Sequence, residues 1–419
     1  MFSIVNETFN SLYLKFKILL KWIFIPCLIG VIVGTVASLF SYTLTTVTNL
    51  RMTHSWFILL LPMGGIIIVK CYQLANITKP KGTNLVISSI RSSEYIPFVM
   101  APLIFISTAI THLLGGSSGR EGAALQLGGS IAQKCGRLLK FTNNDLHILT
   151  MCGMTAAFTA LFGTPLTATI FSMEVISVGI MYYAAIVPCS FSAISALVTA
   201  QLFNIKPEAF TLLNIPDFEL ITILKIIVLS ILCAFLSTLF CKTMHLVEHL
   251  FNHYFKNAYL KIIVGGIIII ILTFIFGHDY NGAGMDIIEQ AINSKVVTYA
   301  FILKIIFTAI TLGSGYKGGE IVPTFFIGAT FGCLIGQLLN ISPSLCAGIG
   351  MIATFCGVTN CPITSLILSF ELFNFTGILY FLIAISISYM LSGYNGLYNA
   401  QKIMYSKYSP IYINKTTNH

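Results

Sequence analysis

Long apolar stretches separated by short polar segments are the feature that most constrains what this chain can fold into. They lie at residues 23–44, 56–74, 96–114, 182–202, 221–241, 262–276, 299–312, 325–339 and 378–391. Several reach the roughly 20 residues that a helix needs to cross a bilayer, whereas others are shorter. A helix that ends inside the membrane leaves backbone groups unpaired, which is tolerated where they line a polar cavity or bind a ligand. The pattern predicts an all-α polytopic membrane protein.

The composition excludes most soluble functions. Only 9% of the residues are charged, whereas a soluble globular domain carries about 25%. A soluble enzyme is therefore excluded. The net charge of +9 comes from 23 basic residues that are scattered between apolar stretches. Nucleic-acid binding usually requires a continuous basic surface, so we expect no nucleic-acid partner.

Lysines cluster at both ends of the chain, outside the first and last apolar stretches. They are Lys15, Lys17, Lys21, Lys402, Lys407 and Lys415. Cytoplasmic segments of membrane proteins are enriched in such residues. We therefore expect a multi-pass protein with both termini in the cytoplasm and an even number of crossings. A membrane-embedded enzyme is the alternative from another class, but it would need a nucleophile, a base or metal ligands. The sequence contains no HExxH or CxxC motif, so we expect neither enzymatic activity nor a metal or cofactor.

The chain also carries an internal repeat. Residues 197 positions apart match in a proline-containing motif and in a glycine-rich loop that precedes it. The pairs are Gly153 with Gly350, Pro165 with Pro362, Glu174 with Glu371, Gly116 with Gly313, Arg120 with Lys317 and Gly122 with Gly319. Two homologous halves in a membrane chain are typical of transporters, which bind their substrate between the halves. Hydropathy does not decide whether the repeats are parallel or inverted.

The repeat predicts the domain organisation. Residues 1–203 form a first membrane repeat with an N-terminal cytoplasmic segment, and the polar residues 204–219 form a linker. Residues 220–400 form the second repeat, and residues 401–419 form a short C-terminal tail.

Three glycine-rich loops, at residues 80–89, 113–129 and 311–332, precede helix-like apolar runs. Each is expected to present a helix N-terminus, where free N–H groups and the helix dipole favour an anion. Glycine allows the backbone to approach closely. At membrane depth such loops would bind an anion without a full positive charge, which suits an ion that must also leave.

Glu121 is the leading candidate for a functional side chain. A carboxylate exposed to lipid would cost at least about 2.5 kcal/mol, so a glutamate between membrane segments calls for a polar site. Its carboxylate could occupy the same amide-lined position as an anion and leave that position when protonated, thereby coupling the two ions. The alternative is that Glu121 neutralises Arg120 or caps a helix. Glu174 and Glu371 occupy matching positions, which favours a structural role for both.

Four motifs in order resemble the CLC family of chloride channels and anion/proton antiporters. They are GREGAALQLGG at 119–129, GTPLTATIFSMEV at 163–175, GGEIVPTFFIGATFG at 318–332 and GLYNAQ at 396–401. The resemblance covers residues 20–405 and implies an inverted repeat with many tilted and partly re-entrant helices. It also implies a homodimer in membrane lipid, with one anion pathway in each subunit.

The resemblance assigns the site residues. Glu121 matches the gating and proton-coupling glutamate, and Tyr398 matches the tyrosine whose hydroxyl faces the central anion. The amides of Glu320 and Ile321 fall where the second glycine-rich loop coordinates that anion. The expected anion-binding residues are Gly82, Thr83, Asn84, Gly119, Arg120, Gly122, Glu320, Ile321, Val322 and Tyr398.

Two departures from the chloride-transporting pattern indicate a branch of the family. Residues 82–86 read GTNLV, where chloride-selective members have GSGIP. Val175 stands where chloride/proton exchangers carry an internal proton-transfer glutamate. The sequence looks most like the bacterial branch that exports fluoride across the cytoplasmic membrane in exchange for protons. A chloride channel or chloride/proton antiporter of the same fold is the alternative.

Overall fold

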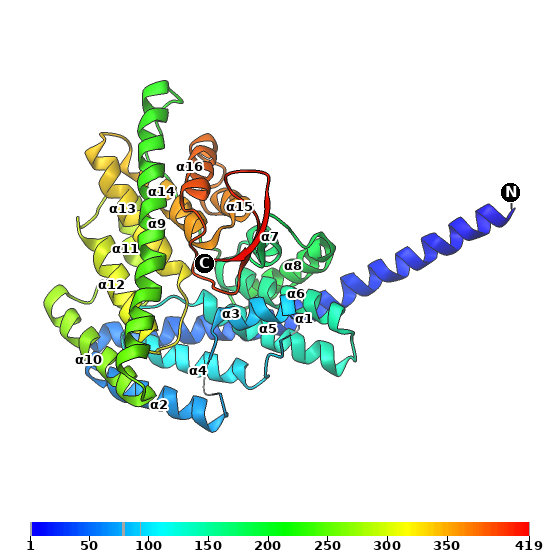
Figure 1. The fold of residues 1–419 in the computed structure, drawn as a ribbon, viewed down its shortest axis with the longest axis horizontal. Coiled ribbons are helices and arrows are strands. Elements are labelled where there is room, and N and C mark those ends of the chain that lie inside the picture. The colour runs from blue at the N-terminus through cyan, green and yellow to red at the C-terminus, as the bar shows by residue number, and fades with distance from the viewer. Residues whose placement is uncertain (1, 78–79, 93, 419) are drawn as a thin grey trace.

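The computed structural model describes residues 2–77, 80–92 and 94–418, which fold into a bundle of tilted helices with one small sheet (Figure 1). The first half contains α1 (Phe2–Thr53), a 3-10 helix (Ser55–Leu60), α2 (Leu61–Leu74), α3 (Thr83–Ser92), α4 (Met100–Leu113), α5 (Glu121–Leu138), α6 (Asn143–Phe162), α7 (Pro165–Glu174), β1 (Ser177–Val178), a 3-10 helix (Tyr183–Ala185) and α8 (Ile186–Leu202). The prediction of an all-α polytopic membrane protein is confirmed.

The second half begins with a long helix that stands upright in Figure 1. It contains α9 (Leu220–Tyr254), α10 (Ala258–Phe276), α11 (Met285–Ile292), α12 (Ala300–Gly313), α13 (Ile321–Leu338), α14 (Pro343–Thr359), α15 (Pro362–Phe373), α16 (Ile378–Leu391), β2 (Lys402–Tyr405) and β3 (Tyr412–Thr416). Residues 203–219 join the halves without a helix or strand and contact both of them. The amide of Glu208 donates to the carbonyl oxygen of Phe162, and the amide of Phe210 donates to that of Leu372.

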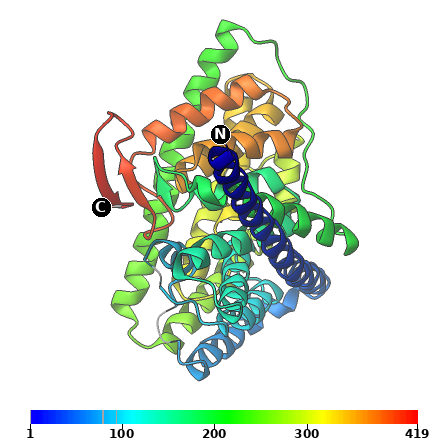
Figure 2. The same ribbon diagram turned by 90° about the vertical axis from the view of Figure 1, so that its right-hand side faces the viewer.

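Seven of the described helical segments are long and apolar enough to cross a membrane. One of them, α6, is absent from the predicted apolar stretches because its asparagine, aspartate, histidine, threonine and glycine residues lower its hydropathy. Its many small residues suit its position, since most of its side chains are buried. The helices α5, α6, α13 and α14 form the core of the molecule, and α5 packs on α6 as α13 packs on α14. The N-terminal end of α1 extends away from this body (Figures 1 and 2).

The two halves meet across a local two-fold arrangement in the glycine-rich loops. Gly119 and Gly319 exchange both backbone hydrogen bonds, at 2.7 and 2.8 Å, in an isolated antiparallel bridge. Two side-chain bonds are also reciprocal. The amide of Ser117 donates to Oγ1 of Thr311, and the amide of Lys317 donates to Oγ1 of Thr111. In each case the equivalent residues are 200 positions apart.

The structure corrects the predicted repeat spacing for these loops. The helices that follow them, α5 and α13, start at Glu121 and Ile321 and end at Leu138 and Leu338, again 200 positions apart. The spacing changes from 200 to 197 within α6 and α14, because α14 has 17 residues whereas α6 has 20. Gly153 and Gly350, which are 197 positions apart, make the equivalent close contacts with Gly128 and Gly328. Arg120 therefore corresponds to Glu320, and its predicted match with Lys317 is wrong. Glycine and serine recur so often in both loops that several spacings give matches.

The second motif keeps the predicted spacing of 197, and its two glutamates bind across the halves. The carboxylate of Glu371 accepts hydrogen bonds from the amides of Leu166 and Thr167, at 2.9 and 2.8 Å. Glu174 accepts in the same way from Ile363 and Thr364, at 3.1 and 2.8 Å. Each glutamate therefore caps the free N–H groups at the start of the helix in the other half.

The C-terminal tail forms two strands that the sequence did not predict. β2 pairs in parallel with β1 of the first half and antiparallel with β3, which gives the order β1-β2-β3. The hairpin lies against one side of the helical body (Figure 2). It ties the end of the chain to the segment that carries Tyr398, since Oγ1 of Thr417 donates to the carbonyl oxygen of Tyr398 at 2.6 Å.

Candidate anion-binding site

The N-termini of α3, α5 and α13 converge at the centre of the molecule. Two glycines allow this approach. A Cβ on Gly122 would lie 2.9 Å from Oγ1 of Thr83 and 3.2 Å from Cα of Gly319, and a Cβ on Gly319 would lie 2.7 Å from the amide nitrogen of Gly122. The three glycine-rich loops predicted from the sequence therefore bring three helix starts together, where backbone N–H groups and helix dipoles favour negative charge.

Glu121 is the first residue of α5 and lies at this convergence with only 1% of its surface exposed. Its Oε2 accepts a hydrogen bond from the amide of Arg120 at 3.1 Å and from the amide of Val322 at 3.3 Å. Val322 lies in the first turn of α13, so the carboxylate occupies a position lined by free amides of the other half. Its Oε1 is buried and has no hydrogen-bond partner among the described residues.

The guanidinium of Arg120 forms its ion pair with Glu208 and not with Glu121. It donates to Oε1 of Glu208 at 2.7 Å and contacts Oγ of Ser41 at 3.3 Å. The carboxylate of Glu121 does cap a helix, but that helix is α13 of the opposite half. A bound anion would also accept hydrogen bonds from these helix N-terminal amides. The geometry is therefore compatible both with a helix cap and with a position that Glu121 shares with an anion.

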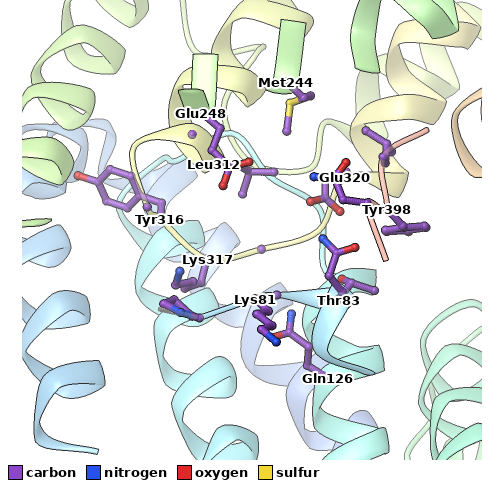
Figure 3. Close-up of a pocket in the computed structure, with 18 of the residues that line it drawn as sticks. Lys81, Thr83, Gln126, Met244, Glu248, Leu312, Tyr316, Lys317, Glu320 and Tyr398 are labelled. Atoms are coloured by element: carbon purple, nitrogen blue, oxygen red, sulfur yellow. The ribbon is translucent and has the colours of Figure 1, made fainter. Parts of the chain in front are cut away.

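A cavity of about 700 Å³ opens beside this convergence (Figure 3). Gly82, Thr83, Asn84, Glu320 and Tyr398 all line it, as the predicted site requires. Figure 3 places Glu320 and Tyr398 close together on one side of the cavity. The remaining predicted residues lie around it. Gly119 and Gly122 form the loop bridge and the close approach, Ile321 and Val322 begin α13, and Arg120 faces a different cavity.

Three polar atoms of residues that line this cavity have no partner in the described part of the protein. They are the hydroxyl oxygens of Tyr72 and Tyr398 and Oε2 of Glu320, and all three atoms are buried. Buried polar atoms of native proteins are nearly always hydrogen-bonded. An incoming ion or water is therefore the natural partner of the Tyr398 hydroxyl, which can donate a hydrogen bond to an anion.

Side chains from several elements hold the segment that carries Tyr398. Oδ1 of Asn84 accepts from the amide of Ala400 at 2.9 Å. Nε2 of Gln401 donates to the carbonyl oxygens of Val175 and Thr359, at 3.0 and 2.8 Å. Asn84, predicted to contact the anion, thus has its amide oxygen engaged with the backbone next to Tyr398.

Sequence reasoning missed several residues that line this cavity. They include Lys81, Gln126, Met244, Glu248 and Lys261. Glu248 could have been found, because it is an ionisable residue within the long apolar helix α9 and such residues usually face a polar cavity. Gln126 carries no comparable signal, since it is one polar residue in a mixed helix.

Comparison with known proteins places this geometry in a family. The family described as voltage gated chloride channel matches residues 63–393. A chloride/fluoride channel protein of Pseudomonas syringae is 31% identical over 93% of this chain and 88% of its own. The crystal structure of a CLC-type fluoride/proton antiporter superimposes with a TM-score of 0.89, at 29% identity, over 92% of this chain and 98% of its own.

A more distant structure shares the fold. A slow cyanobacterial Cl⁻/H⁺ antiporter superimposes with a TM-score of 0.77, at 20% identity, over 89% of this chain and 94% of its own. The family match spans most of the chain, and it includes the glycine-rich loops and Glu121. This chain belongs to the CLC family of voltage gated chloride channels.

Proposed function

We propose that this protein is a fluoride/proton antiporter that exports fluoride across a bacterial cytoplasmic membrane in exchange for protons. The observation that carries the proposal is the position of the Glu121 carboxylate, which is buried on the amide of Val322 where the helix starts converge. A carboxyl group, which carries one negative charge when ionised, thus occupies an anion-type position. Protonation would remove its charge and weaken those bonds, so an anion could take its place.

The proposed cycle uses residues on both sides of Glu121. An anion enters the cavity lined by Thr83, Glu320 and Tyr398 and receives a hydrogen bond from the Tyr398 hydroxyl. A proton arrives on Glu121, and the neutral side chain leaves the α13 amides. The anion then occupies that position and continues to the other side. For exchange, the proton is taken up from the outside and released to the cytoplasm. Its release returns the carboxylate to the amides and closes the path.

Fluoride is favoured over chloride by the similarity of this chain to the fluoride/proton antiporter. Both the chloride/fluoride channel protein and the fluoride/proton antiporter are about 30% identical to it, whereas the chloride antiporter of known structure is 20% identical. The loop at Gly82 presents Thr83 and Asn84 to the cavity. Val175 supplies only its backbone carbonyl, to Gln401, so a second proton-carrying side chain is not available at that position.

The protein is proposed to be a homodimer in membrane lipid with both termini in the cytoplasm. With a cytoplasmic N-terminus, α1 would cross to the outside and the segment that ends with α2 would cross back. Lys81 follows α2 and lines the cavity beside Tyr398, so this cavity would open to the cytoplasm. Chemical crosslinking in detergent should give a species of twice the 45.9 kDa chain mass. A lone band at the chain mass contradicts the dimer.

Ion-selective electrodes on reconstituted vesicles test the function. Vesicles loaded with equal fluoride and chloride should release fluoride selectively when an inward proton gradient is applied, and a fluoride gradient should drive protons uphill. Selective chloride release, or fluoride release that moves no protons, contradicts the proposal. Empty vesicles with the same lipids control for leakage of hydrogen fluoride.

A further inference from the structure

A second cavity, of about 560 Å³, lies at the C-terminal end of α1 and shares no lining residue with the cavity beside Tyr398. Arg51, His112 and Arg120 all line it. It reaches the loop of Glu121, because Arg120 precedes that residue and Nε2 of His112 lies 3.2 Å from the carbonyl oxygen of Gly119. Glu121 itself is buried and lines neither cavity. Its Oε2 accepts from the amide of Arg120, which lines the second cavity, and from the amide of Val322, two residues after Glu320 in the lining of the first.

Arg51 lines this cavity and forms no ion pair with the described residues. Its Nη1 is buried and has no hydrogen-bond partner within the described residues. The guanidinium packs against the backbone, since a Cβ on Gly282 would lie 2.7 Å from Nη1. A buried charge without a partner is unfavourable, and a small anion in the cavity would relieve that cost.

The surrounding charges favour an anion as well. Lys304 is fully buried, and among the described residues its ammonium group donates only to the neutral carbonyl oxygens of Tyr280 and Gly282, at 3.1 and 2.7 Å. Arg51, Arg120 and Lys304 all lie within electrostatic range of His112. In the described part of the chain, Arg120 is the one of these three cations that forms an ion pair, with Glu208.

The acidic residues of the cavity lie at its rim. Asp279 and Asp286 are both exposed to solvent, whereas His112 is buried. Asp286 attracts the Arg51 guanidinium from a distance without forming an ion pair. A solvated carboxylate compensates a buried charge less well than an ion in direct contact does.

We propose that the cavity at Arg51 is an anion-binding site of its own, which holds a monovalent halide on the opposite side of Glu121 from Tyr398. Binding there does not require the proposed fluoride/proton exchange. If that exchange occurs, the site receives the anion after it passes Glu121 and holds it before release.

Crystals of the purified protein soaked in sodium bromide test the site directly. An anomalous bromide peak is expected within hydrogen-bond distance of the Arg51 guanidinium. The peak should persist in Arg51→Lys, which keeps the charge, and disappear in Arg51→Gln. A wild-type crystal with bromide only elsewhere, or with none, overturns the proposal. Bromide at Arg51 in a protein that moves no protons would refute the proposed exchange but support this site.

A substitution of Asp286, at the rim of the cavity, tests whether Arg51 binds an external anion or pairs with a carboxylate of the protein. Asp286→Asn removes the carboxylate that attracts Arg51, so bromide should remain at Arg51 with equal or higher occupancy. If bromide appears only in Asp286→Asn and never in the wild type, the carboxylate is the native partner of Arg51 and the proposal is wrong.

Transport gives a second readout. Arg51→Gln should slow fluoride flux by about tenfold, because a local cation raises the concentration of the anion near the pathway. The ratio of protons to fluoride should stay unchanged, since Glu121 is intact. Arg137→Gln is the matched control, because Arg137 lines neither cavity and stacks on the ring of Tyr95 at 4.2 Å. An equal loss of flux in both variants argues against a specific role for Arg51.

Discussion

Three buried side-chain oxygens at the centre of the molecule have unused hydrogen-bonding capacity. Oε1 of Glu121, Oε2 of Glu320 and the hydroxyl oxygen of Tyr398 lack partners among the described residues. They lie close to where three helix starts converge. Atoms that the fold does not satisfy are the ones that an ion, a proton or a water can use.

Removal of the Tyr398 hydroxyl is expected to weaken transport without lowering stability. Tyr398→Phe removes no hydrogen bond between described protein groups, so the thermal unfolding midpoint in detergent should change little. Fluoride transport should weaken, because the anion loses a donor worth about 1–3 kcal/mol. Concentration dependence of fluoride efflux measures that loss.

Tyr394→Phe is the matched control for this prediction. The Tyr394 hydroxyl bonds to Oγ of Ser406 at 2.8 Å, so its removal should lower stability by about 1 kcal/mol and leave the fluoride dependence unchanged. Unaltered efflux in Tyr398→Phe would remove the hydroxyl from the anion pathway.

At the scale of elements, the reciprocal caps join α7 and α15. Glu174 and Glu371 each accept two backbone N–H groups from the start of the other helix, and Glu174 also accepts from the Thr364 hydroxyl. Charge-assisted bonds of this kind are stronger than neutral ones. The caps therefore hold the two halves in register at a distance from the glycine-rich loops.

Glu371→Gln tests the structural role of these caps. The amide keeps the size of the side chain but loses the charge and one acceptor, so the free energy of unfolding should fall by about 1–3 kcal/mol. Glu174→Gln should show a similar fall, with coupled proton transport preserved in both variants. Loss of proton coupling in Glu174→Gln at normal stability would place Glu174 on the proton path instead.

The C-terminal hairpin holds residues 396–399, which include Tyr398, by hydrogen bonds. Oγ1 of Thr417 donates to the carbonyl oxygen of Tyr398, and Asn418 bonds to Gly396 and Asn399. Lys407 adds bonds to Asn360 and to the end of α16. A tail of this length thus fixes the backbone that presents the tyrosine.

Thr417→Val removes the bond to the Tyr398 carbonyl while keeping the shape of the side chain. We expect a fall in stability of about 1 kcal/mol and a weaker fluoride dependence of transport, because an unpaired carbonyl lets the segment move. Thr416→Val, on the adjacent and less buried position, should leave both properties unchanged. If only stability changes in Thr417→Val, the hairpin does not position Tyr398.

At the scale of the whole molecule, the sequence predicted what local chemistry determines. Apolar stretches gave the helical membrane class, and the glycine-rich loops located the starts of α3, α5 and α13. The 200-residue spacing of the first motif could not be read, because α14 is shorter than α6 by three residues and glycine-rich loops match at many spacings.

Contacts between distant segments also lay beyond the sequence. The pairing of Arg120 with Glu208 depends on how residues 203–219 fold back over α6, and the tail strands depend on β1 as a partner. Arg51 looks like an ordinary basic residue at a helix end until α11 and the preceding loop close over it. Such sites arise from packing, so composition and motifs do not reveal them.

The central claim is that the Glu121 carboxylate occupies an amide-lined anion-binding position and that its protonation couples anion transport to proton transport. Glu121→Gln in reconstituted vesicles tests this most directly, because glutamine keeps the shape but cannot titrate. Fluoride and pH electrodes should record no uphill proton movement on a fluoride gradient, whatever fluoride flux remains. Proton pumping at the wild-type rate in this variant would contradict the account.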